Sequence, residues 1–74
     1  MFKDYDRVRV VRLLMPERPY IEGSTGASRS PQIGDEGTIV ETWLPGGPFC
    51  VECTAGGYTL WIADFASEEL ELIL

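Results

Sequence analysis

A tight acidic turn that leads directly into a β-branched strand constrains this chain more than any other stretch; it spans residues 34–41 (GDEGTIVE). Its two glycines can take backbone conformations that are closed to other residues, and acidic residues are common in turns. The Thr-Ile-Val run favours a pleated, half-buried surface. The sequence on either side also consists of short apolar runs separated by turn residues, with hardly any helical pattern. We therefore expect an all-β fold.

Five short strands are predicted from this pattern. The first alternates apolar and basic residues, and the doubled Val10-Val11 shifts the alternation, which indicates a bulge or a strand that passes between faces. Turn residues separate the next three strands, and a polar segment at residues 64–69 predicts a single 3₁₀ turn before the last one. The predicted strands are residues 7–14, 38–43, 49–53, 58–63 and 70–74.

Five strands and one 3₁₀ turn in so short a chain predict a small SH3-like barrel, in which the sheet closes on itself and few edges stay open. A sandwich is disfavoured because 74 residues hardly supply two sheets, and an oligonucleotide-binding barrel is the structural rival. The length also predicts one domain, residues 1–74. Two prolines and a small polar stretch predict a long first loop at residues 16–31.

The net charge of −6 is distributed unevenly along the chain. All six Lys and Arg lie within residues 1–29 together with four acids, whereas residues 30–74 contain eight acids and no base. Phosphate-binding surfaces need clustered Lys and Arg, so the charge argues against nucleic acid and anionic membranes as partners. A protein partner with a basic surface is the natural match. The alternative is that the acidity only keeps a small domain soluble.

Membrane insertion and export are not expected from this sequence. No segment approaches the roughly 18 apolar residues of a membrane-spanning helix, and the first residues lack the apolar region of a signal peptide. A soluble cytoplasmic protein follows as the expectation.

Catalytic and metal chemistry have little support. The chain has no His, so the usual general base and the usual partner of a Ser or Cys nucleophile are missing. Cys50 and Cys53 form a C-x-x-C, but three residues in a strand span about 10 Å, beyond the reach of a disulfide, and a structural zinc site needs two further ligands. We expect a core Cys53, a free Cys50 thiol, no catalytic or metal-binding residues and no cofactor.

The tryptophans and the acids of the second half are the candidates for partner binding. Exposed aromatic residues are frequent anchors at protein interfaces, although large aromatics in a small domain are more often part of the core. We expect one of the two tryptophans to be buried. Trp61 is out of phase with Leu60 and Ile62, which leaves a surface position open. The candidate partner-binding residues are Asp35, Glu36, Glu41, Glu52, Trp43 and Trp61.

Five short motifs follow one another at defined spacing: Tyr5-Asp6-x-Val8, Gly34-x-x-Gly37-Thr38-Ile39-Val40-Glu41, Phe49-x-Val51-Glu52, Thr59-Leu60 and Glu69-Leu70-Glu71-Leu72. Their spacing resembles a bacterial family of small uncharacterised domains with an SH3-like barrel. The resemblance covers nearly the whole chain except residues 16–30, which look like an insertion. It implies the fold but no agreed activity. Members are sometimes encoded beside toxin-like proteins, which implies an immunity or antitoxin role.

Two other segments, Val8-Arg9-Val10-x-Arg12 and Phe65-Ala66-Ser67-Glu68-Glu69-Leu70, resemble a family of small peripheral reaction-centre proteins of photosystem I, which are also SH3-like barrels. That family docks on a membrane complex and assists an acidic electron carrier, which requires a basic surface. This chain is acidic after residue 30, so only the barrel carries over.

Two functional hypotheses follow from the sequence. The first is a non-catalytic acidic module that binds a basic protein. The alternative is a structural accessory subunit of a larger complex, photosynthetic or otherwise, in which the loop at residues 16–31 makes the contacts.

Overall fold

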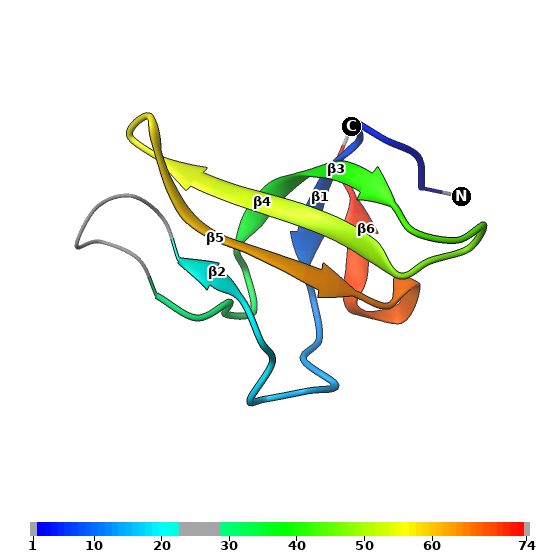
Figure 1. The fold of residues 1–74 in the computed structure, drawn as a ribbon, viewed down its shortest axis with the longest axis horizontal. Helices are drawn as coiled ribbons and strands as arrows, with labels where there is room; N and C mark the ends of the chain where they lie inside the picture. The colour runs from blue at the N-terminus through cyan, green and yellow to red at the C-terminus, as the bar shows by residue number, and fades with distance from the viewer. Residues whose placement is uncertain (1, 23–28, 74) are drawn as a thin grey trace.

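Six antiparallel strands form a single sheet in the computed structural model, which describes residues 2–22 and 29–73 (Figure 1). The strands follow the hydrogen-bonded order β2-β5-β4-β3-β1-β6. A 3₁₀ turn, η1, lies between β5 and β6. The elements are β1 (Arg7–Val10), β2 (Ile21–Glu22), β3 (Glu36–Thr42), β4 (Phe49–Ala55), β5 (Tyr58–Phe65), η1 (Ser67–Glu69) and β6 (Leu70–Leu72). Among the described residues, no helix is long and apolar enough to cross a membrane.

The all-β class and the 3₁₀ turn before the last strand are confirmed. The count of five strands was wrong, because β2 forms inside the predicted loop at residues 16–31, of which residues 23–28 lie outside the described part of the chain. The first strand ends at Val10 and not at residue 14. Its neighbours explain the difference, since β3 begins at Glu36 and β6 at Leu70, so that no strand in the described part of the chain remains to pair beyond Val10.

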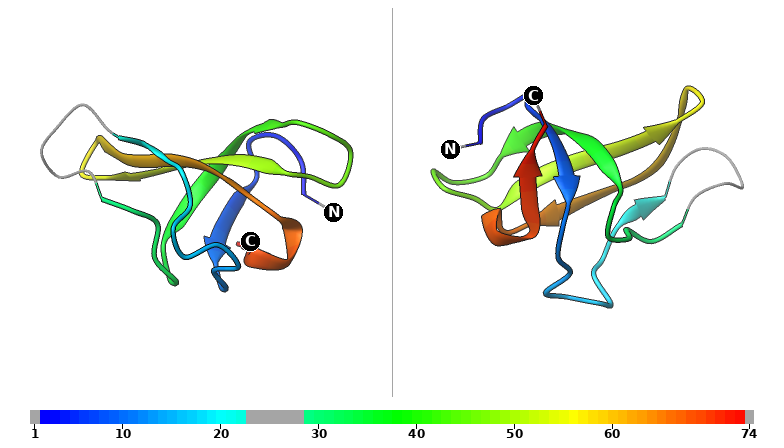
Figure 2. Two further views of the ribbon diagram at one scale, coloured as in Figure 1. Left: turned by 60° about the horizontal axis from the view of Figure 1, so that its bottom comes forward. Right: turned by 180° about the vertical axis from the view of Figure 1, so that it is seen from behind.

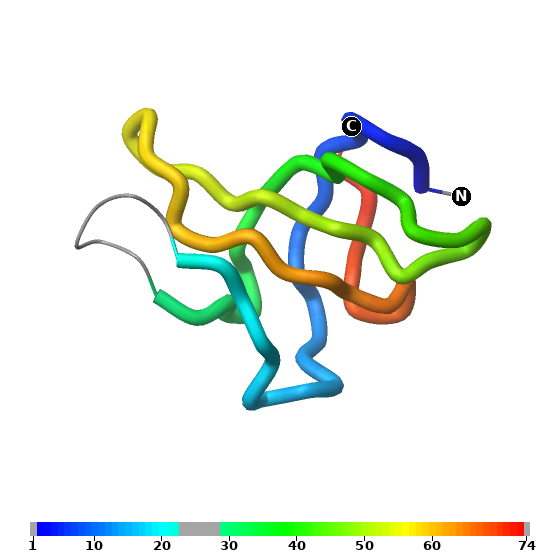
Figure 3. The backbone as a smooth tube through the Cα atoms, viewed as in Figure 1, coloured from blue at the N-terminus to red at the C-terminus, as the bar shows by residue number. Residues whose placement is uncertain are grey.

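The sheet is strongly bent. Figures 1 and 3 show β4 and β5 running steeply across β1 and β6, and the two views of Figure 2 show the same crossing. β3 belongs to both halves, because it pairs with β1 near its start and with β4 along its length. Its register with β4 shifts between Ile39 and Glu41, which is where a bulge increases the bend of a strand.

The concave side of the bent sheet contains the hydrophobic core. The predicted core position of Cys53 is confirmed, because Phe49, Val51 and Cys53 of β4 are buried while Cys50 and Glu52 lie on the other face. Both cysteines are free thiols. The buried apolar residues come from five of the six strands: Val8, Val10, Ile39, Phe49, Val51, Cys53, Trp61, Ala63, Phe65 and Leu70.

Trp61 is a core residue, and its assignment to a partner-binding surface was wrong. Its exposed fraction is 0%, and it lies opposite the buried Cys53 of β4. The sequence suggested the opposite phase because Leu60 and Ile62 are also apolar, so both faces of β5 satisfy an alternating pattern. Pairing with β4 selects the face that contains Trp61.

A buried ion pair attaches the segment before β2 to the core. Arg18 and Glu69 form a salt bridge in which both side chains are almost fully buried. The Arg18 guanidinium also lies 4.1 Å from the centre of the Phe65 ring. Burial raises the pKa of the Glu69 carboxyl, but hydrogen bonds from Arg18 and from the backbone N–H groups of Leu14 and Ala66 lower it further than burial raises it. The start of the predicted loop is therefore packed against β5 and η1.

Gly37 lies where β3 and β4 approach each other closely. A Cβ atom at this position would lie 2.6 Å from the carbonyl oxygen of Glu52 and 2.7 Å from Cγ1 of Val51. The φ angle of Gly37 does not lie in the left-handed region, whereas that of Gly34 does. Glycine is needed here for space.

Replacing Gly37 with Ala is expected to lower the free energy of unfolding by about 2–3 kcal/mol, because the added methyl group must push two paired strands apart. Urea denaturation followed by tryptophan fluorescence measures the loss. Thr54→Ala, at an exposed position of β4, serves as the control and should change stability by less than about 0.5 kcal/mol. Equal stability of Gly37→Ala and the wild type would contradict the close approach.

Candidate functional site

All six basic side chains are bound within the molecule. Four form ion pairs with carboxylates and two bind uncharged oxygens. The ion pairs are Lys3–Asp6, Arg9–Glu36, Arg9–Glu71, Arg18–Glu69 and Arg29–Asp35, while Arg7 donates to the hydroxyl of Thr38 and Arg12 to the carbonyl of Glu68. The positive charge of the chain is thus used to hold the fold together.

The net negative charge consequently lies on the remaining acids. Seven carboxylates have no ion pair with any described residue: Asp4, Glu17, Glu22, Glu41, Glu52, Asp64 and Glu68. Three of them, Glu41, Glu52 and Asp64, project from the central strands β3, β4 and β5 on the face opposite the core.

These three carboxylates surround Cys50. The pairing register places Glu41 and Asp64 directly opposite Cys50 on its two neighbouring strands, and Glu52 follows two residues along β4. The pKa of the Cys50 thiol is raised, first by burial and then by the negative charges of Asp64, Glu41 and Glu52. A raised pKa leaves the thiol protonated and unreactive at neutral pH. Cys50 therefore contributes an uncharged thiol to this face of the sheet.

An open groove of about 270 Å³ lies beside this cluster. Trp43 forms one wall; its side chain is 49% exposed, and its indole Nε1–H donates a 2.8 Å hydrogen bond to Oδ1 of Asp64. The segment that leads into β2 forms the other wall. We name this site the acidic groove and define it by its lining residues Tyr20, Ile21, Trp43, Cys50, Ile62 and Asp64 together with the adjacent Glu41 and Glu52.

The acidic groove includes three of the six predicted binding residues, Trp43, Glu41 and Glu52. Glu36 lies elsewhere, on the edge between β3 and β1, where it pairs with Arg9 at 3.0 Å. Asp64 and Tyr20 were missed. The alternation of β5, followed two residues further, would have placed Asp64 on the same face as Ile62, but no sequence signal indicates that Tyr20 packs beside it.

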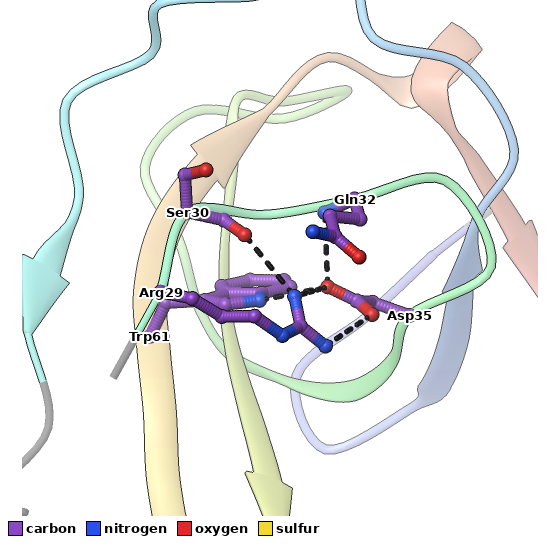
Figure 4. Close-up of polar contacts among 5 residues, drawn as sticks. All are labelled: Arg29, Ser30, Gln32, Asp35 and Trp61. Atoms are coloured by element: carbon purple, nitrogen blue, oxygen red, sulfur yellow. Dashed lines mark hydrogen bonds and ion pairs between the residues drawn. The ribbon is translucent and has the colours of Figure 1, made fainter. Parts of the chain in front are cut away.

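Asp35 was predicted to bind a partner, but its carboxylate is engaged inside the protein (Figure 4). The two Nη atoms of Arg29 donate to its two oxygens at 2.8 Å, and the Trp61 indole and the backbone N–H of Gln32 each donate at 2.9 Å. Only 10% of the Asp35 side chain is exposed. The turn folds this carboxylate inwards over Trp61, so its hydrogen bonds are made within the protein.

Burial alone would raise the pKa of Asp35. The hydrogen bonds from Arg29, Gln32 and Trp61 outweigh burial and hold the pKa of its carboxyl below the ordinary value. Such a lowered pKa means that the ionised form stabilises the folded state.

No group of three Asp, Glu or Cys side chains within residues 2–22 and 29–73 is arranged to hold a metal ion. Comparisons with protein-family models, with curated proteins and with solved structures give no match to this chain. The geometry of the acidic groove is therefore the basis for assigning a function.

Asp35→Asn is expected to lower the free energy of unfolding by about 2–3 kcal/mol at neutral pH, because the charge bound by Arg29 and by the Trp61 N–H is lost. The folded-state pKa lies below the unfolded one, so this stabilisation is present above the ordinary carboxyl pKa and is lost as pH falls through the lowered value. The stability difference between wild type and variant should therefore shrink below about pH 4. Urea denaturation across a pH series measures it.

Glu22→Gln is the control for this experiment, since Glu22 is exposed and has no ion pair with a described residue. It should show no comparable dependence on pH. A stability difference for Asp35→Asn that stayed constant down to acidic pH would contradict the structural role of the ionised carboxylate.

Proposed function

We propose that this protein is a non-enzymatic binding module whose acidic groove receives a basic surface of a protein partner. One observation carries the proposal: the half-exposed Trp43 and the carboxylate of Asp64 line one groove, and two more carboxylates, Glu41 and Glu52, adjoin it around Cys50, none of the three acids having an ion pair with a described residue. Opposite charge increases the rate and specificity of association, and burial of an aromatic side chain supplies affinity.

Exposed apolar residues of the groove support the same conclusion. Ile21 is 64% exposed and lies beside Ile62, its cross-strand neighbour, while Trp43 forms the opposite wall. An apolar floor with charged residues at its margin is the usual composition of an interface, in which the centre is dry and the rim is polar. A partner that buried this floor would bring its basic residues close to Glu41 and Asp64.

The proposal extends to the fold and the type of partner. The strong bend of the sheet and the 3₁₀ turn before the last strand support a small SH3-like barrel, with β2 and β6 as the ends of its hydrogen-bonded order. The motif resemblance to small bacterial SH3-like domains supports an immunity or antitoxin role, in which the basic partner is a toxin-like protein that the groove neutralises.

The accessory-subunit hypothesis depends on the loop at residues 16–31. The described parts of that loop are packed against the domain, because Arg18 is buried and β2 pairs with β5. Tyr20 and Ile21 from this segment line the acidic groove. This arrangement favours the groove over the loop itself as the contact surface.

Titration of the ¹⁵N-labelled protein with a lysine- and arginine-rich peptide tests the proposal. Shift changes should concentrate on Glu41, Cys50, Glu52 and the indole N–H of Trp43, and added salt should weaken binding, because exposed charges are screened. The double variant Glu41→Gln/Glu52→Gln should weaken binding roughly tenfold, which corresponds to about 1.4 kcal/mol.

The matched control is Glu17→Gln/Glu68→Gln, which removes the same charge from two acids outside the groove. It should change affinity much less. Equal weakening by both double variants would mean that only net charge matters, and binding that ignores salt would contradict the electrostatic mechanism.

A further inference from the structure

The hydrogen bond between Trp43 and Asp64 fixes an aromatic ring beside a carboxylate. The indole Nε1–H donates to Oδ1 of Asp64 at 2.8 Å, and the backbone N–H of Trp43 donates to the carbonyl of Pro48 at 3.1 Å. Both the backbone and the side chain of Trp43 are therefore held in place. Asp64 also raises the pKa of the neighbouring Cys50 thiol, but no base among the described residues pairs with its carboxylate.

A cation fits this pair better than any other chemical group. The face of an indole attracts a cation, and a carboxylate at the ring edge can accept hydrogen bonds from it at the same time. A second negative charge is near, since Glu41 and Asp64 lie opposite Cys50 on its two sides. The apolar floor at Ile62 suits the aliphatic stem of a long basic side chain, which packs on apolar surface while its charged end stays at the acids.

None of the chain's own bases occupies this position. In the pairing register, the basic residue nearest to the groove is Arg7. It lies opposite Thr38 of β3, and Thr38 lies opposite Glu52 of β4. Arg7 lies on β1, three strands away from β5, and donates to the hydroxyl of Thr38 at 2.9 Å. Arg18 lines a neighbouring pocket together with Asp64, but it is paired with Glu69. A cation at Trp43 and Asp64 would therefore come from another molecule.

We propose that the acidic groove recognises an arginine side chain of the partner, with its guanidinium on the Trp43 indole and its N–H groups on Asp64. This inference rests on the proposed function and specifies the anchor of that interaction. Arginine suits the site better than lysine, because its planar guanidinium is weakly hydrated, stacks on aromatic rings and donates hydrogen bonds in its own plane. A lysine ammonium offers charge without the planar stacking.

The experiment uses two glycine-serine peptides of equal charge, which carry flanking lysines and differ only in a central arginine or lysine. Binding is followed through the indole ¹⁵N–H signals, with Trp43 assigned by its loss in Trp43→Phe. The arginine peptide should bind roughly fivefold more tightly than the lysine peptide. Its titration should shift the Trp43 signal and leave that of the buried Trp61 unchanged.

Two variants separate the contribution of the Trp43 ring to binding from that of the Asp64 charge. Asp64→Asn keeps an oxygen that can accept the Trp43 N–H and removes only the charge, whereas Trp43→Leu removes the ring; each should abolish the preference for arginine. Tyr58→Leu is the matched control, since Tyr58 is 56% exposed at the β4–β5 turn, and it should preserve the preference. Melting temperatures of all variants identify any that fail to fold, and Asp64→Asn, which retains the hydrogen bond, then carries the test.

The possible outcomes are distinct. A preference for arginine that both groove variants remove supports the arginine anchor. Equal, salt-sensitive binding of the two peptides in the groove would overturn the anchor and leave the proposed function intact. Failure of both peptides to bind the groove would overturn the anchor and the proposed function together.

Discussion

The described fold depends most on the hydrogen bonds that the carboxylate of Asp35 accepts. It accepts hydrogen bonds from Arg29, from the turn at Gln32 and from the buried Trp61, so it joins the approach to β3 with the centre of the core. Its backbone carbonyl accepts from the N–H of Val10, which attaches the same turn to the end of β1. One acidic residue thus fixes three segments that are distant in sequence.

Ion pairing within the domain divides its acidic residues into two groups. Five of them are paired with Lys or Arg and stabilise the domain, as Glu69 does with Arg18 in the interior. The other group has no basic partner among the described residues and includes Glu41, Glu52 and Asp64 around Cys50. In so small a domain, this division leaves the proposed binding surface free of the ion pairs that stabilise the fold.

Local sequence patterns predicted those elements of the fold that depend mainly on neighbouring residues in the chain. The alternation at Phe49, Val51 and Cys53 and the polar segment before β6 identified β4 and η1 from the sequence alone. β2 was missed because two residues form a strand only through pairing with β5. The acidic groove follows the same rule: Glu41, Glu52 and Trp43 were proposed from residue type and expected exposure, whereas Tyr20 and Asp64 come beside them only through tertiary packing.

The chemical character of the acidic groove has a consequence for how it responds to its surroundings. The chain has no His, and the pKa of Cys50, the one thiol in the groove, is raised by burial and by its acidic neighbours. A raised pKa keeps this thiol uncharged near neutral pH, so Cys50 adds no negative charge to the groove. The charge of the groove therefore comes from its carboxylates, whose field dissolved salt screens over about 10 Å at 0.1 M ionic strength.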